Sequence, residues 1–77
     1  MDSTIHRFKN ARIAMFMGDH PPVHVHLLAP GMKVSISVET LKIQGRGDAK
    51  TIAEALRWIA DNHETIIEIW KIRGAKR

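Results

Sequence analysis

The chain has 77 residues and a formal net charge of +4 at pH 7, with its five histidines counted as neutral. It contains no cysteine, which excludes disulfides and thiolate metal sites. A hydrophobic fraction of 44% beside 26% charged residues is typical of a folded protein rather than a disordered one. No apolar run approaches the roughly 18 residues of a membrane helix, and the N-terminus lacks an apolar signal core. We therefore expect one cytoplasmic domain spanning residues 1–77.

The first half of the chain predicts strands. Residues 11–17 form a short apolar run, and residues 23–28 alternate so that His24 and His26 leave one face while valine and leucine leave the other. Residues 32–38 alternate again after a Pro-Gly turn, and residues 41–44 form a shorter run. The pattern predicts three to four antiparallel strands between about residues 10 and 46, with one apolar and one polar face.

The second half predicts helix. Asp48 is suited to cap a helix start, and an apolar stripe follows at steps of three and four residues. The stripe consists of Ile52, Leu56, Ile59, Ile66 and Trp70, with His63 in its one gap. Residues 48–73 are consistent with one long helix or with two short ones broken at Asp61-Asn62. Since this stripe must cover the apolar face of the sheet, the predicted fold class is α+β.

The segment DHPPVHVH, residues 19–26, carries the candidate site. His24 and His26 share one face of a predicted strand, and the proline turn brings His20 towards them. Three imidazoles and a water form an open zinc geometry, so His20, His24 and His26 are the candidate ligands of a divalent metal such as zinc. Asp19 is a fourth ligand or orients one histidine. Two alternatives stay open: a role in proton transfer or anion binding, and surface or partner-contact histidines without chemistry, which the pattern favours.

Three other residues have structural interpretations. His63 and Trp70 lie on the apolar stripe, so we expect a histidine at the edge of the core and a tryptophan within it. Trp58 lies off the stripe and is either packed at its edge or part of an interaction surface.

The positive charge favours anionic partners such as nucleic acid or acidic proteins. No cluster of basic residues falls on one predicted element, and the sequence alone therefore favours a solvated surface. The residues in question are Arg7, Lys9, Arg12, Lys33, Lys42, Arg46, Lys50, Arg73, Lys76 and Arg77.

From about Ser3 to Trp70 the chain resembles the bacterial family named domain of unknown function 4160. The resemblance is carried by the segments TIHRF, MFMGDHPPVHVH, VSISVETLKI and ALRWIADNHETIIEIW. The family more often has its two prolines directly before the middle histidine, whereas here Val23 intervenes. Members are often encoded beside another small protein, as in toxin–antitoxin pairs, so the resemblance implies a protein partner and contact with RNA or DNA.

We therefore expect a small bacterial interaction module, in a toxin–antitoxin-like pair, that contacts a protein partner or nucleic acid through a histidine-rich surface. Its contact residues are Asp19, His20, His24 and His26. The alternative is a histidine-dependent ribonuclease or a divalent-metal-binding protein that uses the same side chains.

Overall fold

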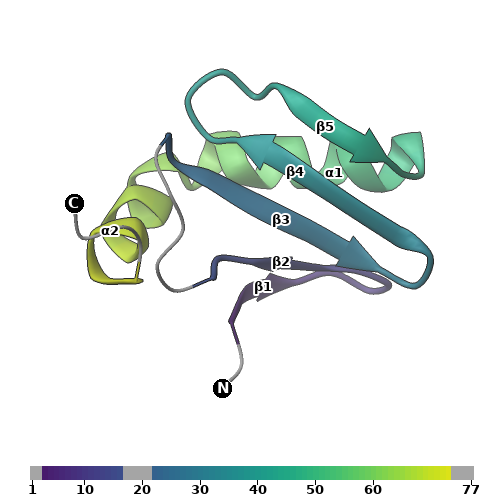
Figure 1. The fold of residues 1–77 in the computed structure, drawn as a ribbon, viewed down its shortest axis with the longest axis horizontal. Coiled ribbons are helices and arrows are strands. Elements are labelled where there is room, and N and C mark those ends of the chain that lie inside the picture. The colour runs from purple at the N-terminus through teal and green to yellow at the C-terminus, as the bar shows by residue number, and fades with distance from the viewer. Residues whose placement is uncertain (1–2, 17–21, 74–77) are drawn as a thin grey trace.

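The computed structural model describes residues 3–16 and 22–73. Five strands precede two helices along the chain (Figure 1). The strands are β1 (Thr4–Arg7), β2 (Arg12–Ala14), β3 (His24–Ala29), β4 (Met32–Ser37) and β5 (Ile43–Arg46). The helices are α1 (Ala49–Asp61) and α2 (His63–Arg73). The predicted α+β class is confirmed.

The strands form one antiparallel sheet in the order β1-β2-β3-β4-β5, so each strand pairs with its neighbour along the chain. The prediction of three to four strands was an underestimate, because β1 lies before the region in which strands were expected. Its register shifts between Thr4 and His6, and this irregularity breaks the strict alternation that marks a strand in sequence. At the other edge, Gly45 has φ +111°, and a Cβ there would lie 2.5 Å from the carbonyl oxygen of Lys33.

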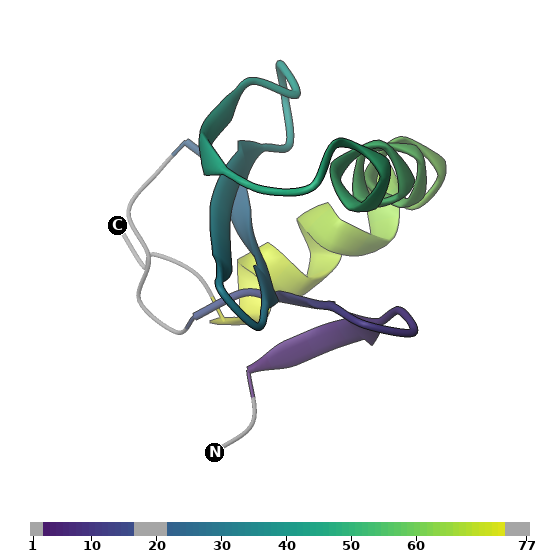
Figure 2. The ribbon, with the colours of Figure 1, turned by 90° about the vertical axis from the view of Figure 1, so that its right-hand side faces the viewer.

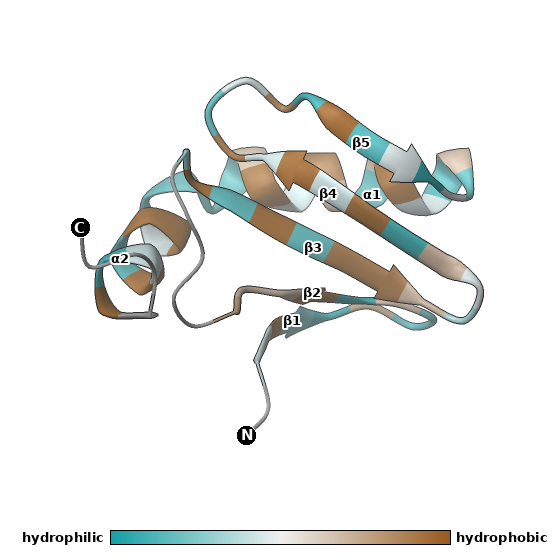
Figure 3. Ribbon diagram, viewed as in Figure 1, coloured by the Kyte–Doolittle hydropathy of each residue, from teal (hydrophilic) through white to brown (hydrophobic). Residues whose placement is uncertain are grey.

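The core lies between one face of the sheet and the helices. Alternate residues of β3 and β4 are fully or nearly buried. Figure 3 shows the matching alternation of hydrophobic and hydrophilic residues along these two strands. The buried apolar residues of the cluster are Ile13, Met15, Val25, Leu27, Val34, Ile36, Val38, Ala55, Ile59 and Ile66. Figure 2 shows α1 and α2 on the same side of the sheet, so neither helix of the described residues covers its other face.

The helical region contains two helices, which resolves the alternative that the sequence left open. Asp48 caps α1 as predicted, since its Oδ2 accepts hydrogen bonds from the N–H and the hydroxyl of Thr51, both 2.9 Å long. Asn62 ends α1: its Nδ2 donates to the carbonyl oxygen of Trp58 at 2.9 Å. The carbonyl of Asn62 in turn accepts from the N–H of Ile66 in α2, at 3.0 Å.

This break corrects the expectation for His63. The residue is exposed, not at the edge of the core, because it is the first residue of α2 at the corner where the chain changes direction (Figure 1). Trp70 is half-buried against the core rather than within it. Trp58 is packed at the edge, where its ring stacks on His6 of β1 with centroids 4.4 Å apart.

Within the described residues, neither helix has the length and apolar character needed to cross a membrane.

Candidate functional site

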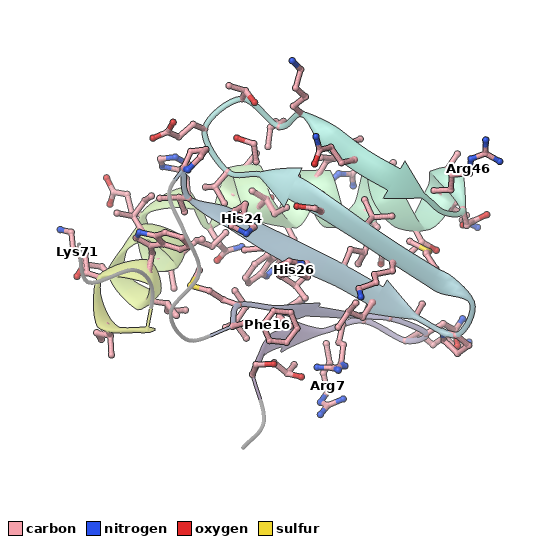
Figure 4. All side chains as sticks on the ribbon, in the orientation of Figure 1. Arg7, Phe16, His24, His26, Arg46 and Lys71 are labelled. Carbon is pink, nitrogen blue, oxygen red and sulfur yellow. The ribbon has the colours of Figure 1, made fainter. Side chains whose placement is uncertain are left out.

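The candidate site is the face of the sheet that points away from α1 and α2, here called the open face (Figure 4). Cross-strand partners in an antiparallel sheet project to the same side, so the register assigns its members. They are Thr4, Arg7, Arg12, Ala14, His24, His26, Leu28, Lys33, Ser35, Ser37, Gln44 and Arg46. Phe16, which follows β2, joins them through its contact with His26.

His24 and His26 lie two residues apart on β3, and their ring centroids are 5.1 Å apart. Ser37 and Ser35 are their partners on β4. Asp19 and His20, the other two candidate residues, lie outside the described residues. The four-residue contact surface therefore stays a prediction, of which the structure positions the two strand histidines.

A backbone hydrogen bond orients His24. Its Nδ1 lies 2.8 Å from the carbonyl oxygen of Pro22. Since a carbonyl only accepts hydrogen bonds, Nδ1 carries a proton, and in the neutral ring the lone pair then belongs to Nε2. Backbone carbonyls often fix the tautomer of metal-binding histidines in this way, so the arrangement suits His24 as a ligand or a base.

His26 is less suited to either task. Its Nε2 is buried from solvent, so this nitrogen is not accessible to an ion or substrate arriving from the open face. Among the residues that the structure describes, no group of three or more His, Cys, Asp or Glu is arranged to hold a metal ion. The three-histidine metal site requires His20 and stays a prediction.

A chain of aromatic rings runs over the first half of β3. Phe16 contacts His26 at a centroid distance of 4.7 Å, and the two histidine rings are in contact. His24 in turn lies 5.8 Å from the ring of Trp70, because α2 passes the end of the sheet where β3 begins (Figure 1). Phe16 is 37% exposed, so one end of this chain presents an aromatic ring to solvent.

A row of cations crosses the open face beside these rings. The register places Arg7 opposite Arg12, Arg12 opposite Leu28, Leu28 opposite Lys33, and Lys33 opposite Arg46. We call Arg7, Arg12, Lys33 and Arg46 the basic row. With strands about 4.8 Å apart, a row over five strands is about 19 Å long. Figure 4 shows its two ends, Arg7 and Arg46, near opposite edges of the sheet.

The surface at the β1–β2 end of the basic row is hollowed. Arg7, Lys9 and Arg12 line a hollow of about 570 Å³ beside the turn that joins the two strands. Arg12 is oriented there by a hydrogen bond of 2.8 Å from its guanidinium to the hydroxyl of Thr4. Three cationic side chains around one depression form a suitable environment for an anion.

The charge of the described elements is divided between the two layers. The five strands contain four cationic residues, the basic row, and no carboxylate. The two helices contain four cationic and four acidic residues and are neutral in sum. Four basic residues that are scattered in the sequence are therefore gathered on one face of the sheet. The expectation of a solvated surface stays a prediction.

Residues 10–71 match the family described as Domain of unknown function (DUF4160). The chain belongs to the DUF4160 family. No curated protein and no solved structure matches it. The part matched to DUF4160 includes the two strand histidines and three residues of the basic row, whereas Arg7 and the rest of β1 precede it. The toxin–antitoxin context stays a prediction from the resemblance.

Sequence reasoning missed the basic row because its members come from four different strands. Lys33 and Arg46 are 13 positions apart in the sequence and become neighbours only through the register of β4 and β5. The available signal was the absence of acidic residues from every predicted strand. Phe16 was missed as well, since an apolar run such as residues 11–17 does not show which ring remains exposed.

Proposed function

We propose that this DUF4160 protein is a nucleic-acid-binding module that contacts the sugar–phosphate backbone of RNA or DNA with the open face of its sheet. The observation that carries the proposal is the basic row, a line of four cations on strands that contain no carboxylate. Phosphate contacts by lysine and arginine supply most of the affinity of sequence-independent nucleic-acid binding. Arg7, Lys33 and Arg46 of this row are exposed, as such contacts require.

The electrostatic repulsion between cations of the basic row supports a binding role. Lys33 and Arg46 are direct cross-strand partners, and like charges in that position destabilise a sheet. Arg7 and Arg12 are cross-strand partners as well, and Arg12 also donates a hydrogen bond to the hydroxyl of Thr4. An anion bound between Lys33 and Arg46 would reduce the repulsion between them.

The test is a pair of double variants with the same loss of charge. Lys33→Gln with Arg46→Gln removes half of the basic row, and Arg57→Gln with Lys71→Gln removes two exposed cations from the helices. Binding of fluorescent RNA and DNA oligonucleotides is measured by anisotropy over a series of salt concentrations. For a single strand we expect a slope of log affinity against log salt that falls by about 1.4 in the first variant, at about 0.7 per lost cation.

The control variant should retain the slope of the unsubstituted protein. Equal losses in both variants would show that only net charge matters, and would overturn the assignment to the open face. Binding of an acidic protein or peptide without any binding of RNA or DNA would also overturn the proposal and would favour a protein partner.

A further inference from the structure

We infer that the nucleic acid bound by the open face is single-stranded, with a base stacked on Phe16 while the backbone follows the basic row. This inference rests on the proposed function and adds the class of ligand. It is drawn from the width of the sheet, the exposed aromatic ring, and the position of that ring relative to the cations.

The open face is wider than the major groove of a B-form duplex. The major groove of B-form DNA is about 12 Å wide and admits a helix or a two-stranded ribbon. A sheet of five strands is about 19 Å across, and the helices that could enter a groove lie on its other side (Figure 2). The major groove is therefore too narrow for this face, whereas bases that are already unpaired and turned outward are accessible to it.

Phe16 provides a platform for such a base. It is the aromatic member of the four large apolar side chains that are exposed in the described part of the chain. Its ring rests against His26 with centroids 4.7 Å apart, so its orientation is supported from β3. Sheets that bind single strands stack bases on aromatic side chains of this kind, and every base has a face that can stack.

The spacing between ring and cations fits one nucleotide. His26 lies two residues before Leu28, whose partners on either side are Arg12 and Lys33 of the basic row. Two residues along a strand correspond to about 6.7 Å. A backbone on the basic row would thus have its bases directed along β3 towards Phe16. Ser35, the partner of His26, and Gln44 beyond it provide hydrogen-bonding groups in the same line.

The experiment distinguishes contacts to bases from contacts to phosphates. The probes are a labelled oligothymidylate of about 12 nucleotides, an abasic strand with the same number of phosphates, and a duplex of the same length. We expect the unsubstituted protein to bind the oligothymidylate roughly tenfold more tightly than the abasic strand, as one base–aromatic stack provides. Phe16→Leu should remove this preference and leave the salt dependence unchanged, whereas Phe16→Trp should keep it.

Ile43→Ala is the matched control, since Ile43 is exposed to a similar extent but is the partner of the buried Ile36 and lies on the other face. Circular dichroism establishes that each variant is folded. Equal affinity for the base-bearing and abasic strands, tighter binding of the duplex, or an undiminished preference in Phe16→Leu would overturn the inference while the proposed function stands. Failure to bind any of the three probes would overturn both.

Discussion

Lys33 and Arg46 show how one pair of residues connects stability with binding. Both side chains are exposed and lie opposite each other on β4 and β5. Each of the two residues adds a positive charge to the open face, and the two like charges repel each other. Removing one of the two charges is therefore expected to raise the stability of the fold and to lower its affinity for an anion.

Lys33→Glu tests these opposite effects on stability and on binding. The substitution replaces a like-charge pair by an opposite-charge pair, so we expect the free energy of unfolding to rise by roughly 0.2–1 kcal/mol at low salt. The same substitution should weaken nucleic-acid binding at least tenfold, because it removes one cation and adds a repelling carboxylate. Urea unfolding measures the first effect and anisotropy the second.

Lys71→Glu is the control for this change in net charge, since Lys71 lies on α2, where it forms an ion pair of 3.5 Å with Glu68. It should leave binding unchanged and should not stabilise the protein. A Lys33→Glu variant that binds as before would contradict the role given to the basic row.

Among the elements, α1 shows what local sequence signals can specify. The Asp48 cap could be predicted because capping depends on a few adjacent residues. The break at Asn62 could only be left open, since a continuous stripe and an interrupted one have the same spacing in sequence. Tertiary packing determined the break between the two helices, since Ala55 and Ile59 of α1 and Ile66 of α2 are all buried in the same core. The short, irregular β1 had no comparable signal.

The cap of α1 predicts a dependence of stability on pH. The backbone N–H and the hydroxyl of Thr51 donate to Asp48 and lower the pKa of its carboxyl below the usual value of 3.8. A pKa that is lower in the folded state contributes stability above the unfolded value, and this contribution is lost as the pH falls through the folded pKa. Asp48→Ala should thus lower the melting temperature at pH 7, and the difference from the unsubstituted protein should shrink below about pH 3.8.

Asp48→Asn is the matched variant, because asparagine also caps helices but carries no charge. It should be nearly as stable as the unsubstituted protein at pH 7 and should lack the loss on acidification. A melting temperature of Asp48→Ala that runs parallel to that of the unsubstituted protein down to pH 2 would contradict this explanation of the cap.

At the scale of the whole molecule, the chain has a neutral helical layer and a cationic sheet. Alternation in the strands specified which residues face the core, so the α+β class and the position of His24 and His26 on the face away from the core followed from sequence. The basic row did not, because it depends on the register of four strand pairs at once. A surface formed by residues from several strands cannot be predicted from spacing along the chain.

The most direct measurement of the central claim is an NMR titration of the isotopically labelled protein with a short single-stranded oligonucleotide. The account predicts that chemical-shift changes concentrate on the open face, at Phe16, His24, His26, Lys33 and Arg46, and that the outward sides of α1 and α2 remain unperturbed. Changes centred on the helices, or no changes at all at low salt, would contradict it.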